Sequence, residues 1–343
     1  MLNKLAKIIQ AGWSEPNLLT FLLLPLSGVY RVLMALRKVF YKNRWFHVYQ
    51  SPVPVLIVGN ISVGGTGKTP LTIAMVEKAR KFGFEPGVVS RGYGGQALDW
   101  PQAVTPETTP HYVGDESVLI SQSVECPVVV GPKRSEAIEL LLANNSCDLI
   151  ISDDGLQHYA IARDAEIAVI DDQRRNLNSF CLPAGPLREP TKRLNSVDQV
   201  FRHVPPKERS EGDFSESKDN LFRLKNNGFR KVVDHQVSEL DANRKIHAVA
   251  GIGHPLRFFR QLRAMGFDVE EHAFADHHRY IASDFDFVNE EDCVIMTAKD
   301  AVKCATFAMS DWYYLSVEVE FNQAAEQRIE ELFSSLKDNP KLT

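Results

Sequence analysis

Residues 53–70 read Val-Pro-Val-Leu-Ile-Val-Gly-Asn-Ile-Ser-Val-Gly-Gly-Thr-Gly-Lys-Thr-Pro, an apolar run followed by a glycine-rich segment. This order predicts a strand, a phosphate-binding loop and the start of a helix. In such a loop, backbone N–H groups surround the phosphates of a nucleotide, a lysine adds positive charge, and a threonine hydroxyl binds Mg²⁺. The residues expected to hold the nucleotide are Ser62, Val63, Gly64, Gly65, Thr66, Gly67, Lys68 and Thr69.

One position departs from the usual pattern G-x-x-x-x-G-K-[ST], because Ser62 stands where the first glycine is expected. The alternative is a glycine-rich loop with a lone lysine. The apolar strand before the loop, the helical pattern over residues 71–82 and the intact Gly67-Lys68-Thr69 favour the nucleotide site.

The composition indicates a globular protein with two domains. The chain has 343 residues, of which 44% are hydrophobic and 24% charged. Five cysteines, an odd number with no Cys-x-x-Cys pair, favour a reducing compartment over a disulfide framework or a cysteine zinc site. The net charge of −5 is uneven: residues 1–50 contain seven Lys or Arg against Glu15, a charge of +6, so the remainder carries −11.

The basic N-terminal region has two apolar parts. Residues 18–30 are uncharged but contain Pro25, and they are fewer than the about 20 apolar residues that span a bilayer. The next segment is amphipathic: an apolar face is formed by Val32, Leu36, Val39 and Phe40, and nearly opposite lie Arg31, Lys38 and Lys42. Such a helix can lie in a membrane interface with its cations near anionic headgroups. No small-residue cleavage site follows, which disfavours a secretory signal, but a pair of core helices stays open as an alternative.

Charged residues follow several predicted strands, at the sheet edge where α/β proteins bind ligands. Arg91 follows strand 86–90, Asp115 lies in the turn Val-Gly-Asp-Glu over 113–116, and Arg134 opens a helix after strand 126–130. Strand 149–152 ends in Asp153 and Asp154, which resemble the acids that hold Mg²⁺ beside nucleotide phosphates. A GTPase would have Asn-Lys-x-Asp, and Thr-Ala-Lys-Asp at 297–300 places the lysine differently.

The second half of the chain predicts another α/β unit. Strand 166–171 leads to a proline-rich loop at 182–190, and a polar stretch over 205–227 indicates a linker or hairpin. Strands at 246–250, 267–274, 293–296 and 312–319 follow, with helices up to residue 265 and from about residue 322. Three nearby histidines, His272, His277 and His278, suggest a metal site, but adjacent loop histidines rarely bind one ion. Asp276 beside His277 instead suggests proton transfer or phosphate contact, with a solvated loop histidine as the alternative.

Taken together, an ordered set of motifs resembles the tetraacyldisaccharide 4′-kinases of lipid A synthesis. The motifs are the phosphate loop over 58–70, Ser-Arg-Gly-Tyr-Gly at 90–94, Gly-Asp-Glu at 114–116, Asp-Asp-Gly-Leu-Gln at 153–157, Leu-Pro-Ala-Gly-Pro-Leu-Arg-Glu-Pro at 182–190, Ala-Gly-Ile-Gly at 250–253, Asp-His-His at 276–278 and Thr-x-Lys-Asp at 297–300. The resemblance covers about residues 20–305. It implies ATP and Mg²⁺ as cosubstrate and metal, and transfer of the γ-phosphate to the 4′-hydroxyl of a tetraacylated glucosamine disaccharide 1-phosphate, giving the 1,4′-bisphosphate.

The resemblance also implies roles for particular residues. Lys68, Asp115 and His277 correspond to catalytic positions, with Asp115 as the general base. Thr69, Asp153 and Asp154 correspond to the Mg²⁺ side of the site, whereas Arg91, Arg134 and Glu189 correspond to positions near the phosphates or the sugar. Family members often have Glu where this chain has Ala298, so the resemblance assigns no role to Ala298 and leaves it open.

We therefore expect an α/β protein with a membrane-associated segment over 1–45, a P-loop kinase core over 46–204, a linker or hairpin over 205–230 and a smaller α/β domain over 231–343. Its expected partners are the lipid substrate and the cytoplasmic surface of the bacterial inner membrane; no nucleic acid and no obligate protein partner are expected. Two other functions remain as alternatives: a membrane-associated P-loop ATPase that drives movement, and a nucleotide-sensing adaptor. Neither would phosphorylate a lipid.

Overall fold

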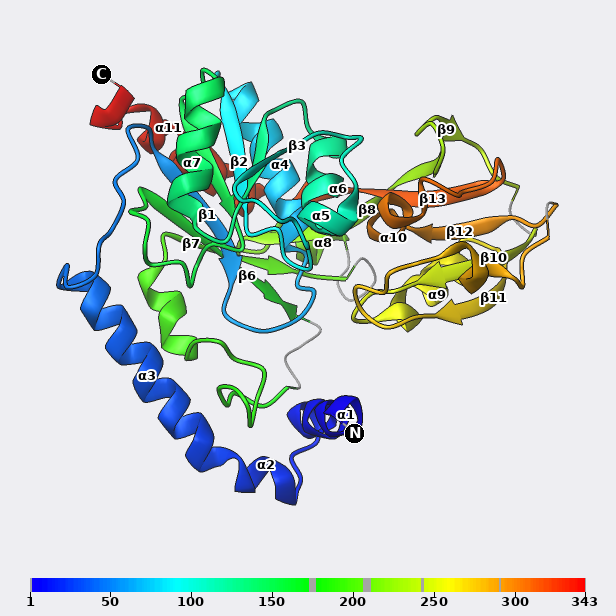
Figure 1. The fold of residues 1–343 in the computed structure, drawn as a ribbon, viewed down its shortest axis with the longest axis horizontal. Coiled ribbons are helices and arrows are strands. Elements are labelled where there is room, and N and C mark those ends of the chain that lie inside the picture. Colours follow the sequence, from blue (N-terminus) through cyan, green and yellow to red (C-terminus); the bar gives the residue numbers. More distant parts are fainter. Residues whose placement is uncertain (1, 173–176, 206–210, 242–243, 290, 343) are drawn as a thin grey trace.

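The computed structural model describes residues 2–172, 177–205, 211–241, 244–289 and 291–342. Within them, one mixed sheet of thirteen strands runs through two lobes (Figure 1), in the order β11-β10-β12-β13-β8-β7-β6-β1-β5-β2-β4-β3, with β9 paired to β8. The larger lobe contains β1 (Val55–Asn60), β2 (Pro86–Ser90), β3 (Gln102–Val104), β4 (Val128–Val130), β5 (Leu149–Asp153), β6 (Ala165–Asp171) and β7 (Gln199–His203). The smaller lobe contains β10 (Lys245–Ala250), β11 (Asp268–Ala273) and β12 (Val294–Thr297).

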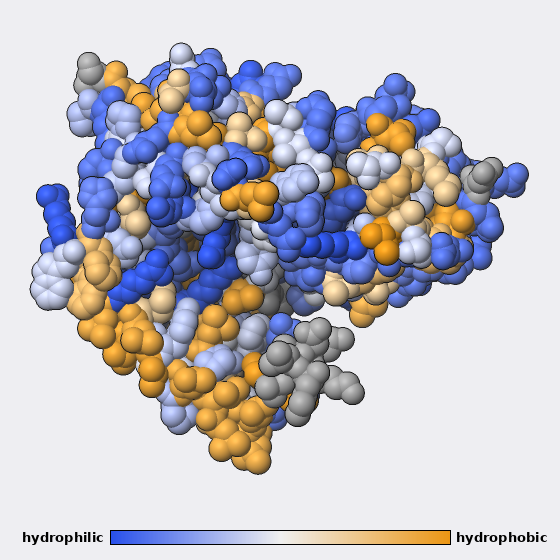
Figure 2. All heavy atoms as spheres, in the orientation of Figure 1, coloured by the Kyte–Doolittle hydropathy of each residue, from blue (hydrophilic) through white to orange (hydrophobic). Residues whose placement is uncertain are grey.

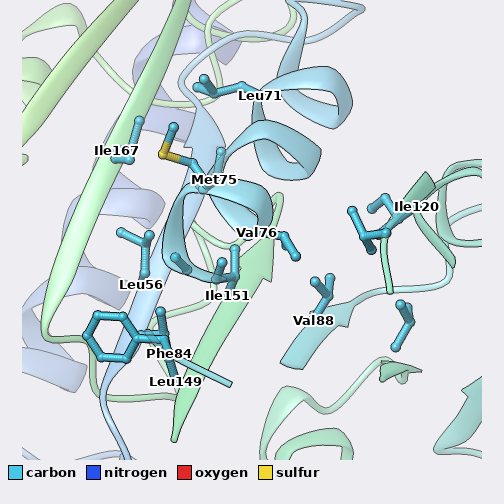
Figure 3. Packing of buried hydrophobic residues seen from close by; sticks show 14 of the residues in the cluster. Leu56, Leu71, Met75, Val76, Phe84, Val88, Ile120, Leu149, Ile151 and Ile167 are labelled. Atoms are coloured by element: carbon cyan, nitrogen blue, oxygen red, sulfur yellow. The ribbon is translucent and has the colours of Figure 1, made fainter. Parts of the chain in front are cut away.

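The centre of the larger lobe is β1, whose six residues are all buried between the parallel strands β5 and β6. Helix α4 (Lys68–Lys81) covers one face, where its Leu71 and Met75 pack against Leu56 and Ile151 (Figure 3). On the other face, α7 (Arg134–Asn144) packs in a second apolar cluster with Ile57. This double covering explains why the strands are continuous apolar runs, and it fixes the start of α4 at the end of β1.

Two long antiparallel strands connect the lobes, β8 (Leu221–Lys231) and β13 (Trp312–Phe321). The sequence predicts β13 but places β8, except for its last residue, in the linker or hairpin over 205–230, of which residues 206–210 lie outside the described part. After β13, helix α11 (Gln323–Lys337) returns to the larger lobe, where Ile329 and Phe333 join the cluster of α4. The C-terminal helix therefore packs on the P-loop core, which differs from the expected division at 231–343.

The smaller lobe repeats the α/β arrangement on its own core. Helix α9 (Pro255–Ala264) packs through Phe258, Phe259 and Leu262 on one face of β10 and β11. Helix α10 (Ala298–Cys304) follows β12 and points towards α5 (Pro110–Val113) and α6 (Asp115–Ser123) of the larger lobe. The remaining elements are short: α8 (Glu211–Ser215), β9 (Val237–Ser238) and three 3₁₀ turns at Thr191–Ser196, Ala282–Phe285 and Pro340–Leu342.

The N-terminal region forms α1 (Leu2–Ser14), α2 (Leu18–Leu22) and α3 (Leu24–Lys42), with Pro25 in the first turn of α3. Hydrogen bonds attach α3 to the larger lobe: Ser27 Oγ donates to the carbonyl of Cys181 at 2.7 Å, and Tyr30 Oη donates to that of Arg188 at 3.0 Å. In its predicted apolar stripe, Val32, Leu36 and Val39 are exposed, at 59%, 46% and 45%, and Phe40 is half-buried. Because these side chains are not in a core, the alternative of a core helix pair is wrong for this stripe.

The exposed apolar side chains form a continuous patch over α2 and α3 (Figure 2), made by Leu18, Phe21, Leu22, Leu26, Val29, Val32, Leu33, Leu36 and Val39. We call this set the apolar face. Across the described part of the chain, none of the helices combines the length and the hydropathy that crossing a membrane requires.

Candidate active site

The phosphate loop joins β1 to α4 in the predicted way. Gly64 and Gly67 have positive φ angles of 102° and 88°, a conformation that favours glycine. A Cβ on Gly67 would also lie only 3.1 Å from His203 Nδ1. Inside the loop, Asn60 Nδ2 donates to Thr66 Oγ1 at 3.0 Å. Lys68 is the first residue of α4, and its Nζ lies 3.5 Å from Asp154 Oδ1.

The proline-rich loop over 182–190 lies against the start of the phosphate loop. The Val63 N–H donates to the carbonyl of Pro186 at 2.9 Å, and Ser62 pairs with Leu187 in an isolated bridge. The Arg188 N–H donates to the carbonyl of Ile61 at 2.7 Å. In this conformation the Val63 N–H already has an acceptor, and the assignment of residues 62–69 to the nucleotide stays a prediction.

The two acids at the end of β5 have different surroundings. Asp153 is buried and accepts a hydrogen bond from Thr72 Oγ1 at 2.8 Å through one oxygen. Burial, with the nearby charges of Glu116 and Asp154, raises the pKa of Asp153. Asp154 has a positive φ of 48°, and both its oxygens accept from Arg188 Nη1, at 3.0 and 2.9 Å. Burial alone would raise the pKa of Asp154, but the charges of Lys68 and Arg188 outweigh it and lower that pKa.

The oxygen atoms beside the phosphate loop suit a hard divalent cation. Asp153 Oδ2 is buried and has no hydrogen-bond partner among the described residues. An unpartnered buried carboxylate oxygen is costly unless a cation or its water contacts it. The half-buried Thr69 lies in the first turn of α4. These oxygen donors fit Mg²⁺, which prefers carboxylate, hydroxyl and water oxygens to nitrogen.

Asp115 opens helix α6 and is buried. The preceding Gly114 has a φ of 87°, and a Cβ there would lie 2.4 Å from the carbonyl oxygen of Tyr93. The close approach of the 91–95 loop therefore requires glycine before the acid, which explains the Gly-Asp sequence. It also fixes Asp115 at the end of the larger lobe that faces the smaller one.

His277 of the smaller lobe meets Asp115. Its Nδ1 lies 3.2 and 3.1 Å from the two carboxylate oxygens, and its ring packs edge-on against Tyr93 at 5.3 Å. The bond to Asp115 raises the pKa of His277. Burial would raise the pKa of Asp115, but the bond from His277 and the charges of two lysines outweigh it and lower that pKa. The sequence placed both residues in the site, and the structure brings them together from positions 162 residues apart.

Lys299 completes the contact between the lobes. Its Nζ lies 3.2 Å from His277 Nε2, 3.1 Å from Glu116 Oε1 and 4.0 Å from Asp115 Oδ2. Burial opposes the charge of Lys299, but Glu116 and Asp115 outweigh it and raise its pKa. Lys303, one turn further along α10, lies 3.8 Å from Asp115 Oδ2. A buried acid, a histidine and two ammonium groups therefore form one charged cluster.

The three residues predicted near phosphate or sugar differ in exposure. Arg91 is exposed after β2, whereas Arg134 and Glu189 are 2% and 5% exposed. Arg134 donates to the carbonyls of Gly131 and Asp153 at 3.2 and 3.1 Å, and burial lowers its pKa to about 10. Glu189 accepts from Gln157 Nε2 at 2.8 Å and from the hydroxyl of Tyr159. Arg134 and Glu189 are thus held by protein partners.

Four residues that contact predicted site residues are missing from the predicted site: Thr72 and Arg188 beside the acids after β5, and Lys299 and Lys303 in the charged cluster. Helical spacing could have indicated two of them. Thr72 lies four residues after Lys68 on the same face of α4, and Lys303 lies four residues after Lys299. Arg188 and Lys299 stood inside quoted motifs, but nothing in their spacing showed that one would bind Asp154 and the other His277.

Comparisons with known proteins agree with this geometry. The family model described as tetraacyldisaccharide-1-P 4′-kinase matches residues 19–334. A tetraacyldisaccharide 4′-kinase of Methylobacillus flagellatus is 46% identical over 93% of this chain and 91% of its own length, and one of Nitrosococcus oceani is 43% identical over 92% and 90%. The crystal structure of the "apo" form of LpxK from Aquifex aeolicus in complex with ATP superposes with a TM-score of 0.75 at 25% identity, over 92% of this chain and 99% of that one. This chain belongs to the tetraacyldisaccharide-1-phosphate 4′-kinase family.

Proposed function

We propose that this kinase performs the reaction of its family between the two lobes, with Asp115 and His277 at the acceptor. In this reaction the γ-phosphate of ATP goes to the 4′-hydroxyl of tetraacyldisaccharide 1-phosphate, giving the 1,4′-bisphosphate of lipid A biosynthesis. The observation that carries the placement is the contact of His277 with Asp115, 3.1 Å across the lobes. Glu116, the residue after Asp115, lies near enough to Asp153 to affect its pKa, which links this contact to the phosphate side.

Each side of the site has a separate task. Lys68 and the backbone of the phosphate loop hold the transferring phosphoryl group, and Mg²⁺, when bound by Thr69, Asp153 and Asp154, neutralises phosphate charge. Asp115 is ionised because its pKa is lowered, so it can accept a proton from the acceptor hydroxyl. His277 orients this carboxylate through Nδ1–H. Since phosphoryl transfer is loose, positioning the hydroxyl contributes more than removing its proton.

The predicted substrate-side residues divide into two groups. Exposed Arg91 is free to meet an anionic part of the substrate or nucleotide. Arg134 and Glu189 act through neighbours instead: Arg134 holds the backbone of Asp153, and Glu189 holds Gln157 and Tyr159. We therefore assign these two as positioning residues.

The fate of labelled γ-phosphate tests the reaction. Wild-type protein with [γ-³²P]ATP, Mg²⁺ and the disaccharide lipid should place the label on the lipid, and Lys68→Ala should not. Lys81→Ala is the matched control, because Lys81 is an exposed lysine at the other end of α4. Label released only as free phosphate would favour the ATPase alternative, and ATP binding without turnover would favour the adaptor.

The lipid substrate requires access to a membrane, and the apolar face of α2 and α3 supports peripheral association. Residues 22, 26, 29, 33 and 36 are three or four apart, so they lie on one side of the helical segment. On the neighbouring polar side are Arg31, Lys38 and Lys42, all exposed. This arrangement matches a helix lying in the interface of an anionic membrane. We place the protein at the cytoplasmic face of the inner membrane, where ATP is present.

Paired charge substitutions on α3 test this orientation. Leu26→Asp with Leu33→Asp places two charges on the apolar face and should abolish binding to anionic vesicles. The control, Gly28→Asp with Ala35→Asp, adds the same charges about 200° around the helix, where both residues are exposed and Gly28 has open space. Replacing Arg31, Lys38 and Lys42 by Gln should weaken binding by roughly 1 kcal/mol per charge. Equal binding of the two double variants to anionic vesicles would contradict the proposed orientation of α3 in the membrane interface.

A further inference from the structure

A cluster of metal-binding side chains lies on the smaller lobe, outside the kinase site. His247 of β10 is paired in register with Glu270 of the parallel strand β11, and His272 follows Glu270 by two residues. Because side chains two apart in a strand share a face, all three project to the same side of the sheet. This is the side opposite α9, whose cluster contains Ile246 and Ala248 instead.

The three facing atoms form a triangle of the size that one ion requires. His247 Nδ1 lies 3.0 Å from His272 Nε2, and these nitrogens lie 3.9 and 3.8 Å from Glu270 Oε1. The point equidistant from three atoms with these separations is about 2.1 Å from each, which is within the range of zinc–nitrogen and zinc–carboxylate bonds.

Neighbouring side chains hold the three potential ligands in place, as is usual in metal sites. The other nitrogen of His247, Nε2, faces Asp292 Oδ2 at 3.5 Å, and this oxygen is held by the N–H and the Nδ2 of Asn289, both at 2.9 Å. The second oxygen of Glu270 lies 3.1 Å from Lys245 Nζ. The ring of His272 stacks on Phe287 at 3.6 Å. Carboxylates behind a ligating histidine, and partners on a ligating carboxylate, fix ligand orientation in metal sites.

We propose that His247, Glu270 and His272 form a binding site for Zn²⁺. Two imidazoles and one carboxylate suit zinc, with a fourth position open to water. The same set is a poor site for Mg²⁺, which requires oxygen donors, so this site is distinct from that of Mg²⁺ beside ATP. An ion can reach it, because Glu270 is exposed and β11 is an edge strand of the sheet. Bound zinc would tie β11 to β10.

The rival explanation is a simple hydrogen bond between the two imidazoles, which also fits a nitrogen separation of 3.0 Å. It requires no ion and gives Asp292 no effect on metal affinity. The two explanations therefore predict different results when the purified metal-free protein is titrated with zinc.

The test is calorimetric titration of the full chain with ZnCl₂ in excess Mg²⁺, with Co²⁺ absorption as a second readout of ligand geometry. Wild-type protein should bind one Zn²⁺ per chain, and Mg²⁺ should not compete. Asp292→Asn, which removes no ligand, should weaken binding about 10–100-fold, and His247→Gln and His272→Gln should weaken it more. His47→Gln, an exposed histidine of the other lobe, should bind like the wild type.

Thermal unfolding separates lost binding from lost folding. Zinc should raise the Tm of the wild type and of His47→Gln but not that of His272→Gln, while the metal-free proteins should all unfold cooperatively. The proposal is overturned if the wild type shows no saturable zinc binding, or if His247→Gln and His272→Gln bind as the wild type does. It is also overturned if Asp292→Asn leaves the affinity unchanged, since the carboxylate would then have no part in a metal site.

Discussion

The phosphate side and the acceptor side of the site are built in different ways. On the phosphate side, the loop after β1, the end of β5 and the proline-rich loop all belong to the larger lobe and are joined by backbone and side-chain bonds. On the acceptor side, Asp115 and His277 come from different lobes and meet where α10 packs against α5 and α6. Further contacts there join Lys299 to Glu116 at 3.1 Å and Arg279 to the carbonyl of Gly94 at 3.2 Å. The phosphate side is therefore preorganised, whereas the acceptor side depends on the relative position of the lobes.

On the preorganised side, the largest effect is expected at Lys68. Lys68→Ala removes the charge that we propose stabilises the transferring phosphoryl group, and kcat should fall about 10²–10³-fold. The thermal transition should change little, because the ion-pair contact that Lys68 makes among the described residues is a single one, to Asp154 at 3.5 Å. Steady-state kinetics beside Lys81→Ala measure this. A variant that keeps more than about a tenth of the wild-type kcat, a loss below ~1.4 kcal/mol, would show that this loop is not the catalytic phosphate site.

A smaller effect is expected at Arg188, which binds both oxygens of Asp154. Arg188→Gln should lower kcat about 10–100-fold and raise the Mg²⁺ concentration needed for half-maximal rate, because partners of a metal ligand fix its orientation. The control is Lys192→Gln, an exposed cation four residues later. If Arg188→Gln leaves the Mg²⁺ concentration for half-maximal rate unchanged, Asp154 does not contact the metal ion.

The smallest effect is a shift in titration at the contact between the lobes. Asp115 raises the pKa of His277, while burial and Lys299 oppose it, so Asp115→Asn should lower the pKa of His277. In the wild type, the stabilisation from His277 is complete below about pH 6.5 and is lost as pH rises through its raised pKa. The stabilisation from Asp115 is present above its ordinary value of 3.8 and is lost as pH falls through its lowered pKa. NMR titration of the imidazole resonances measures this shift; an unmoved His277 resonance would mean that the lobes do not close in solution.

The two sides of the site also differ in how far the sequence predicts them. The phosphate loop, the acids after β5 and most strands follow from local apolar runs, glycines and spacing, and the structure confirms these elements. Nearly all of β8 falls within the predicted linker or hairpin because its residues are largely polar, and its pairing with β13, about 90 residues away, is not a local property. Likewise, α11 has a clear helical pattern, but its packing on the larger lobe depends on the direction of β13. The meeting of Asp115 with His277 was expected from family resemblance and not from spacing.

The central claim is that Asp115 and His277 act as one unit at the acceptor. Single-turnover transfer to the disaccharide lipid should be measured for the wild type, Asp115→Asn, His277→Ala and the double variant. Each single change should lower the rate about 10²–10⁴-fold with little change in ATP affinity, and the double variant should be scarcely slower than the slower single, because effects within one unit are not additive. Two losses that multiply would contradict a joint action, and a fully active Asp115→Asn would remove this carboxylate from the mechanism.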